Sequence, residues 1–545
     1  MNNNGSRETR RERLLVVVIA SLVSILAFCW YFSHGELLLY GDAVAHINIA
    51  RRVFDSRSPG PLQLGTVWLP LPHVAMIPFL VNDWMWRTGV GGAIPSMIAY
   101  VLGVFGVYRL VRGRQPAYIA GAAAAIYGLN PNLLYMQTTA MNEPMLMAEL
   151  AWALVYLDEL KRALHPPVKP ESTAIDGQPA LAPYKSIERC GMVLAAAILT
   201  RYDGWVLAAA CGVALIWLLW RGRRSEALRS DWPRIRRAVV AFFALCAVVP
   251  VLWLAQNYAL SARPLDFING PYSAKAIEAR TSKAGYASHP GAGHPLDALL
   301  YFFQSAKLNV APYRGSLPFM LLVFLGTAYA LVFRRTHGVW MLLWFPLPFY
   351  VYAVAYGSVP IFMPVWWPHS YYNVRYGLEM LPCFAVFAAI AIGTVGKLRF
   401  SRPALFTAVI AGFLVVVSYL PLLPETPICL REARVNSRSR IALEETLAGV
   451  LSGVRPDSTV LIYTGEYVGA LQRAGIPLRQ TINETIHPAW EEALSHPGRS
   501  ADFIVGVAGD DLWYATRLFP KGLEKIAEFQ VPGKPRVIVY RGIAR

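Results

Sequence analysis

The sequence predicts a polytopic α-helical membrane protein with about 11 transmembrane helices, followed by a soluble α/β domain at the C-terminus. Of its 545 residues, 55% are apolar and only 16% are charged. Soluble proteins carry about a quarter of their residues as charges, so this composition argues against a soluble enzyme. Apolar stretches close to the roughly 20 residues that a membrane-spanning helix needs recur through residues 1–424, whereas 425–545 contain only short apolar runs.

The predicted topology begins with a signal anchor. Residues 13–32 form an apolar run that follows an arginine-rich start, and no small-residue cleavage site comes after it. We therefore expect an uncleaved first span with the N-terminus inside. The complete set of predicted spans is 13–32, 91–110, 116–131, 142–160, 188–200, 203–220, 237–259, 315–333, 338–356, 376–396 and 403–423.

The basic residues support this topology. Arginines gather in the predicted inner loops, such as 109–114 and 221–237, whereas the predicted outer turns 132–141 and 357–374 contain no Lys or Arg. This distribution follows the positive-inside rule. It indicates that the net charge of +17 serves membrane anchoring rather than nucleic-acid binding. Segment 68–88 is predicted to be interfacial or re-entrant, because counting it as a span would turn 109–114 outward.

An odd number of spans places the C-terminus outside. Residues 425–545 are predicted to form a soluble α/β domain there, and residues 1–424 a transmembrane domain. The outer parts of the transmembrane domain are the first outer segment, 33–88, and a loop at 260–314 that can be a mobile lid or a solvated connection. We expect a bacterial inner membrane, with a cytoplasmic N-terminus and a periplasmic C-terminal domain. The predicted strands are 459–464, 501–507 and 536–540, alternating with predicted helices 466–475, 488–496 and 510–519.

The first outer segment contains a candidate catalytic carboxylate and, one helical turn later, a candidate substrate-binding histidine. Residues from Asp42 onward have helical periodicity, so Asp42 and His46 share one face of a juxtamembrane helix. A carboxylate held just outside the bilayer suits a general base acting on a lipid-borne substrate. The structural alternatives are that Asp42 only caps the helix and that His46 makes a simple polar contact. In the C-terminal domain, Asp510 is interpreted as a helix N-cap rather than as a metal–nucleotide ligand.

Another acidic residue opens the fourth predicted span. Glu143 lies between Asn142 and Pro144, which are typical of a helix N-terminus, so a purely structural role explains it equally well. If the first and fourth spans are neighbours, Glu143 faces the same outer cleft as Asp42. Two carboxylates in one cleft could bind an acceptor or a divalent metal.

Two arginines at the membrane boundary are candidate phosphate ligands. Arg201 lies in a tight turn between two short spans, and charged groups so close to hydrocarbon are usually paired or functional. Its planar guanidinium suits a lipid phosphate, and the alternative is a simple pair with Asp203. Arg375 lies beside Tyr372 and Tyr376 and is either a second phosphate ligand or a snorkelling anchor.

Five segments carry a resemblance to a known family. They keep one order and spacing over residues 13–425 and read GDAVAHINIARR (41–52), WLPLPH (68–73), NPNLLYMQTTAMNEP (130–144), TRYDGW (200–205) and RYGLEMLP (375–382). Together they resemble the GT-C superfamily of polyprenyl-phosphate-sugar-dependent glycosyltransferases, particularly bacterial relatives of the aminoarabinose and protein-mannosyl transferases.

The resemblance implies a membrane glycosyltransferase that acts on the outer face. A sugar would pass from a polyprenyl-phosphate donor to a lipid, glycan or protein acceptor with inversion, with Asp42 as the base and Glu143 as a second acidic catalytic residue. No cofactor is firmly implied, although a divalent metal is compatible with the acidic residues. The rival predictions are a lipid-linked sugar transporter or flippase and a non-catalytic polysaccharide-assembly subunit. The implied substrate-binding residues are His46, His73, Arg201, Tyr202, Asp203, Tyr372, Arg375 and Tyr376.

Overall fold

The computed structural model describes residues 3–164, 181–281, 289–312, 315–333 and 337–543. Each of the eleven predicted spans falls on helix in this part of the chain. The helices are α1 (Asn3–Ser33), α5 (Val90–Arg112), α6 (Ala117–Gly128), α8 (Glu143–Leu164), α9 (Pro183–Thr200), α10 (Asp203–Arg221), α12 (Trp232–Ser261), α16 (Ser316–Val332), η3 (Gly338–Trp344) with α18 (Pro346–Tyr356), η4 (Val374–Met380) with α19 (Leu381–Arg399), and α20 (Pro403–Tyr419) with η5 (Leu420–Leu422).

Seven of these segments are long and apolar enough to cross a membrane: Arg10–Ser33, Val90–Arg112, Asp203–Arg221, Trp232–Ser261, Gly338–Tyr356, Val374–Arg399 and Pro403–Leu422. The multi-pass prediction is therefore confirmed. The α6 and α16 helices are apolar but shorter, and α8 carries several charged residues at its ends. The predicted span 116–131 stops early, at Gly128, because Asn130 caps the short helix α7 (Pro131–Met136) and starts a new direction.

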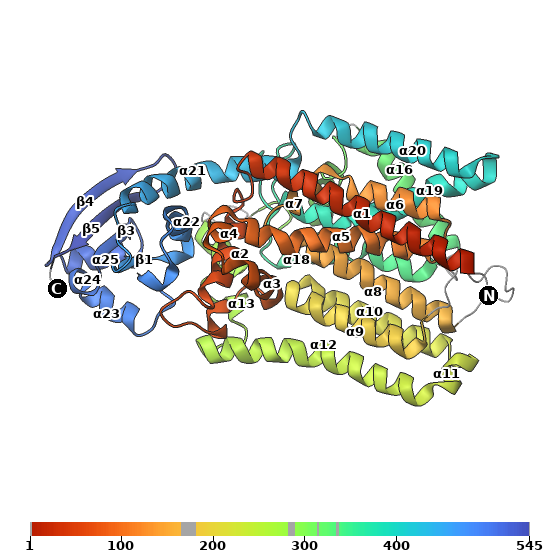
Figure 1. The fold of residues 1–545 in the computed structure, drawn as a ribbon, viewed down its shortest axis with the longest axis horizontal. Coiled ribbons are helices and arrows are strands. Elements are labelled where there is room, and N and C mark those ends of the chain that lie inside the picture. The colour runs from red at the N-terminus through yellow and green to blue at the C-terminus, as the bar shows by residue number, and fades with distance from the viewer. Residues whose placement is uncertain (1–2, 165–180, 282–288, 313–314, 334–336, 544–545) are drawn as a thin grey trace.

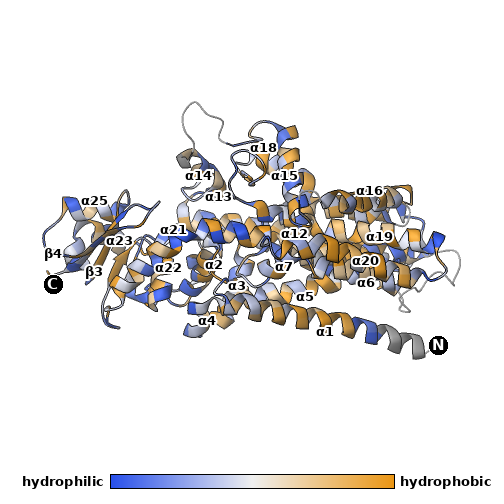
Figure 2. Ribbon diagram, turned by 90° about the horizontal axis from the view of Figure 1, so that it is seen from above, coloured by the Kyte–Doolittle hydropathy of each residue, from blue (hydrophilic) through white to orange (hydrophobic). Residues whose placement is uncertain are grey.

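The helices form a bundle with a buried centre and an apolar periphery. In the apolar stretch of Val374–Arg399, 89% of the residues are buried. In the apolar stretches of α1 and α12, only 17% are buried. Figure 1 shows α12 along one edge of the bundle and α20 along the opposite edge. Exposed apolar helices at the edge of a bundle face lipid in a membrane protein. In Figure 2, apolar colouring is concentrated in the helical bundle.

A layer of short helices lies between the bundle and the C-terminal sheet (Figure 1). Segment 68–88 folds as α3 and α4, and with 11 residues α3 is too short to span a bilayer. Residues 282–288 and 313–314 of the predicted loop 260–314 lie outside the described residues. The short elements outside the sheet domain are α2 (Gly41–Arg52), η1 (Pro61–Leu64), α3 (Pro70–Leu80), α4 (Asp83–Thr88), α11 (Glu226–Ser230), α13 (Asp266–Asn269), α14 (Ala274–Thr281) and α15 (Pro295–Leu308).

The C-terminal part is a sheet with helices, as predicted, but the sheet has five strands where the sequence predicted three. Its strand order is β2-β1-β3-β5-β4; β1 is parallel to β2 and β3, and β5 is antiparallel to β3 and β4. Asp510 caps α25 by accepting a hydrogen bond from the Trp513 amide at 2.6 Å, which confirms the N-cap interpretation. The elements are β1 (Val460–Ile462), α22 (Thr464–Ala474), η6 (Leu478–Gln480), β2 (Thr481–Ile482), α23 (Ala489–Ser495), α24 (Pro497–Ser500), β3 (Phe503–Val507), α25 (Asp511–Leu518), β4 (Leu523–Gln530) and β5 (Arg536–Gly542).

One long helix joins the two parts of the molecule. The α21 helix (Ile428–Leu451) has 24 residues and runs from the end of the bundle to the sheet domain (Figure 1). It packs against α7 and η4 in the bundle and against α22 in the sheet domain. A helix of this length extends about 36 Å, so the same rigid element reaches both parts.

Candidate active site

Asp42 lies in the first turn of α2, at the end of the bundle nearest the sheet domain. The helix begins at Gly41 with Tyr40 at the N-cap position, and no side chain caps it. The alternative that Asp42 is the N-cap is therefore wrong. The carboxylate is 43% exposed, and Arg375 donates a hydrogen bond to its Oδ2 atom at 2.6 Å. An acidic group in the first turn is also stabilised by the helix dipole.

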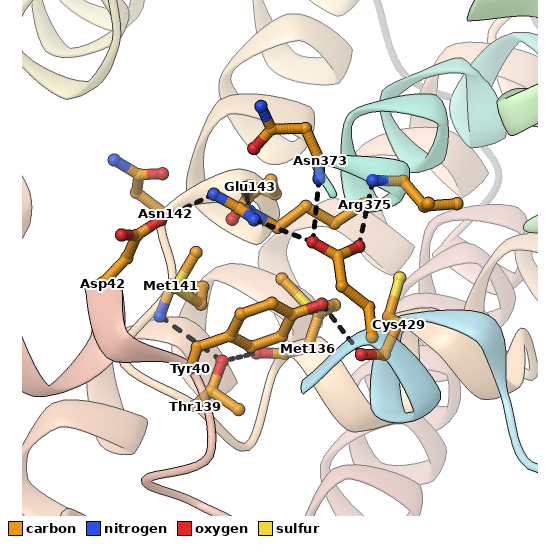
Figure 3. Close-up of polar contacts among 12 residues, drawn as sticks. Tyr40, Asp42, Met136, Thr139, Met141, Asn142, Glu143, Asn373, Arg375 and Cys429 are labelled. Carbon is orange, nitrogen blue, oxygen red and sulfur yellow. Dashed lines mark hydrogen bonds and ion pairs between the residues drawn. The ribbon is translucent and has the colours of Figure 1, made fainter. Parts of the chain in front are cut away.

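Arg375 connects three carboxylates from different elements (Figure 3). Besides Asp42, its Nε lies 3.1 Å from Glu143 Oε1 and its Nη1 lies 3.2 Å from Glu432 Oε1. The guanidinium also lies over the rings of Tyr40 and Tyr376, with its Cζ atom 5.1 and 5.0 Å from the two ring centres. Because Arg375 is buried, it does not fit the snorkelling alternative, which requires a charged head in water.

Glu143 begins α8 and is completely buried. Its Oε1 atom is 3.1 Å from Arg375 Nε and 3.4 Å from Arg201 Nη1, so one carboxylate oxygen faces both arginines. The other oxygen, Oε2, has no hydrogen-bond partner among the described residues. The two predicted acids, Asp42 and Glu143, are thus brought together through Arg375.

Arg201 forms a second group of contacts beside the first. Its Nε is 3.1 Å from Asp203 Oδ2, so the predicted pair with Asp203 is present. Its Nη2 is 3.2 Å from Glu379 Oε1, and its Nη1 donates to Asn142 Oδ1 at 2.9 Å. The guanidinium lies 5.2 Å from the centre of the Tyr376 ring, which Arg375 also contacts. The Tyr376 ring therefore links the two groups of contacts.

The predicted histidines form a buried pair next to Asp42. His46 Nδ1 lies 2.8 Å from His73 Nε2, and the centre of the His46 ring lies 4.6 Å from the centre of the Trp68 ring. Burial, together with the positive charges of Arg201 and Arg375, lowers the pKa of His46 to about 3. A histidine with this pKa is neutral at pH 7 and acts as a hydrogen-bonding group rather than as a cation.

Of the two remaining predicted tyrosines, Tyr202 contacts the first outer segment, whereas Tyr372 lies close enough to Asp42, Arg375 and Glu432 for their charges to act on its hydroxyl. The Tyr202 hydroxyl donates to the Val67 carbonyl at 2.8 Å, and its ring stacks on Phe267 at 4.5 Å. Tyr202 thus connects α10 with the first outer segment. Tyr372 is 40% exposed and forms a backbone bridge with Phe362 in the loop before η4.

Sequence reasoning missed three members of the site. Tyr350 donates a hydrogen bond from its hydroxyl to Glu379 Oε1 at 2.7 Å. Glu379 follows Arg375 by four residues, and a carboxylate next to an apolar span is itself a signal of pairing or function. Glu432 had no such signal, because it lies in the charged sequence of α21.

Carboxylates outnumber the two arginines in this cluster. Asp42 is the exposed member, whereas the other four are at most 2% exposed. Among the described residues, no group of three or more His, Cys, Asp or Glu side chains is arranged to hold a metal ion. The carboxylates of the cluster are Asp42, Glu143, Asp203, Glu379 and Glu432.

The sequence matches no known family profile and no curated protein. Among solved structures, ArnT from Cupriavidus metallidurans bound to undecaprenyl phosphate matches with a TM-score of 0.55 at 14% identity, over 97% of this chain and 98% of that one. The oligosaccharyltransferase AglB from Archaeoglobus fulgidus matches with a TM-score of 0.47 at 12% identity, over 97% of this chain and 74% of that one. The arabinofuranosyltransferase AftD from Mycobacteria matches with a TM-score of 0.42 at 15% identity, over 98% of this chain and 42% of that one. The match to ArnT extends over nearly the whole of both chains, so this protein has the fold of the GT-C glycosyltransferases.

Proposed function

We propose that the protein is a membrane glycosyltransferase that moves a sugar from a polyprenyl-phosphate donor to a lipid, glycan or protein acceptor at the outer face of a bacterial inner membrane. The observation that carries this proposal is the exposure of Asp42. It is 43% exposed, whereas Glu143 and Glu432, which share Arg375 with it, are buried. A general base must reach the proton that it removes, and of these three only Asp42 is accessible to an acceptor.

The proposed reaction is a single displacement. Asp42 takes the proton of the acceptor hydroxyl as its oxygen attacks the anomeric carbon of the sugar. The bond between that carbon and the phosphate oxygen breaks, and polyprenyl phosphate leaves with the electron pair. Among the described residues, Asp42 Oδ1 accepts no hydrogen bond, while Oδ2 is held by Arg375. The free oxygen is therefore the one proposed to receive the proton.

The leaving phosphate needs positive charge at a fixed position. Arg201 and Arg375 both contact the Tyr376 ring, at 5.2 and 5.0 Å, and are the proposed source of that charge. Glu143 faces both guanidinium groups and would keep them in place. The buried pair His46–His73 is proposed to contribute neutral hydrogen-bonding groups beside the sugar. Tyr202, Asp203 and Tyr372 remain predicted substrate-binding residues.

The test is the release of free polyprenyl phosphate from a panel of radiolabelled polyprenyl-phosphate sugars by the purified full-length protein. Asp42→Asn keeps the shape of the side chain and removes the base, and we expect it to abolish turnover. Loss of a general base typically lowers the rate by about 10²–10⁴-fold. The matched control is Asp83→Asn, a change at a 71% exposed aspartate of the same outer segment.

Three results separate the candidate functions. Turnover by wild type and Asp83→Asn, but not by a folded Asp42→Asn protein, supports the proposal. Equal turnover by Asp42→Asn removes Asp42 as the base. If no donor is cleaved, with or without a mixture of lipid and glycan acceptors, the result contradicts the transferase function and favours the transporter and assembly-subunit functions.

A further inference from the structure

Glu432 makes three polar contacts although it is almost completely buried. Its Oε1 and Oε2 atoms accept hydrogen bonds from the backbone amides of Asn373 and Val374, both at 2.9 Å. Oε1 also lies 3.2 Å from Arg375 Nη1. The carboxylate therefore binds the residue before η4, the first residue of η4 and the side chain of Arg375 at once. A side chain bound in this way restricts both the backbone next to Arg375 and its guanidinium.

The same helix, α21, also holds the chain just before Asp42. The Tyr40 hydroxyl donates to the carbonyl oxygen of Cys429 at 2.8 Å. Further along α21, Arg440 Nη2 donates to the carbonyl oxygens of Leu38 and Leu39, at 2.7 and 2.9 Å. These contacts hold the segment that leads into α2 and so set the position of the first turn of the helix, which contains Asp42.

The far end of α21 is joined to the sheet domain. Arg440 is paired with Glu444, which is 3% exposed and lies 3.1 Å from Nε of Arg473 in α22. A Cβ atom added to Gly469 of α22 would lie 2.1 Å from the Glu444 carboxylate, so the two helices are in close contact there. Figure 1 shows α21 passing from the bundle to this contact.

We infer that Glu432 is a positioning residue that holds Arg375 against Asp42, and that α21 thereby couples the placement of the C-terminal sheet domain to the geometry of the membrane site. One rigid helix supports the Arg375 side of the site through Glu432 and the Asp42 side through Arg440. A shift of the sheet domain along or around α21 changes the separation of Asp42 and Arg375. This inference rests on the proposed function for the role of Asp42, but not for the contacts themselves.

The kinetic test compares Glu432→Gln with Glu492→Gln, a change of the same type at an exposed position of α23 in the sheet domain, away from α21. For Glu432→Gln we expect kcat on the cleaved donor to fall by about tenfold or more, with little change in KM, because small displacements of catalytic groups have effects of this size. Glu492→Gln should behave as wild type. A wild-type kcat in Glu432→Gln, or a loss confined to KM, would overturn the inference.

A second measurement does not depend on turnover. Hydrogen exchange of the full-length protein in detergent reports on the segments 371–376 and 38–43 separately. In Glu432→Gln, we expect faster exchange at 371–376, where two amides lose a charged acceptor, and also at 38–43 if the coupling through α21 exists. Faster exchange at 371–376 alone would contradict the coupling, and no change in either segment would contradict the positioning role. Should wild type cleave no donor, this result still decides the inference, while the proposed function fails.

Arg440→Gln provides an independent variant in case Glu432→Gln does not fold. It removes the contacts of α21 to the carbonyls before Asp42 without touching Arg375. Arg438→Gln, at an exposed position two residues away, is its control. We expect Arg440→Gln to accelerate exchange at 38–43 and to lower kcat, whereas an effect equal to that of Arg438→Gln would overturn the coupling.

Discussion

Replacing Arg375 by Met tests the charge balance of the site. Methionine keeps an unbranched apolar chain but removes the guanidinium that contacts Asp42, Glu143 and Glu432. Asp42 is 43% exposed, so water replaces much of the lost contact there. Glu143 and Glu432 are at most 1% exposed and cannot be hydrated in the same way. The cost of the substitution therefore comes mainly from the two buried carboxylates.

The size of this cost follows from the partners that remain. Removing one partner of a buried ion pair typically destabilises a protein by about 3–5 kcal/mol. Glu143 would keep Arg201 at 3.4 Å, and Glu432 would keep the amides of Asn373 and Val374. Because each buried carboxylate retains a partner, we expect the lower end of the range, about 3 kcal/mol.

The assay is unfolding by sodium dodecyl sulfate in mixed micelles, followed by tryptophan fluorescence, at fixed pH and lipid content. Arg438→Met, at an exposed position on α21, is the control and should cost less than about 0.5 kcal/mol. The double variant Arg375→Met/Glu432→Gln should cost about 1 kcal/mol less than the sum of its single variants, because the neutral glutamine side chain leaves no unpaired charge where Glu432 stood. A cost for Arg375→Met below about 1 kcal/mol, or strict additivity of the two changes, would refute this reasoning.

Two further predictions concern packing and pH. Gly326→Ala in α16 should destabilise the protein by about 3 kcal/mol, because the added Cβ would lie 1.9 Å from a backbone carbonyl oxygen of α19. Gly412→Ala in α20, with no atom within 4 Å of the new Cβ, should be neutral or stabilise by up to about 1 kcal/mol, and the same unfolding titration compares the two. Because burial lowers the pKa of His46 from 6.5 to about 3, the stability that the neutral ring provides is complete above pH 6.5 and is lost as the pH falls toward 3. Between pH 7 and pH 5 wild type should lose about 2 kcal/mol more than His46→Asn, and an equal loss in both proteins would contradict the assignment of this titration to His46.

Much of the fold was predictable because its signals are local in the sequence. An apolar helix needs about 20 consecutive residues, and a charged flank marks its inner end. The cap of α25 by Asp510 was also local, since the capping interaction extends over only three residues. By contrast, β2 has two residues, and β4 alternates buried and exposed positions in a charged sequence. Neither strand has the apolar run by which the other three were found.

The candidate site was predictable in part. Asp42, Glu143, Arg201 and Arg375 could be singled out because charges beside apolar spans are costly and so require a reason. Their partners could not be deduced from spacing. Glu432 in particular lies in an ordinary charged helix, and only the packing of α21 against η4 brings it to Arg375.

The sequence by itself determined the order of the apolar helices, the presence of the sheet domain and which charged residues border the bundle. These properties depend on hydropathy and period, which are fixed by neighbouring residues. Only the tertiary structure decided which charges meet: Arg375 contacts carboxylates that are 333, 232 and 57 residues away along the chain. An ion pair depends on the distance between atoms, and across such separations that distance is set by helix packing rather than by sequence spacing.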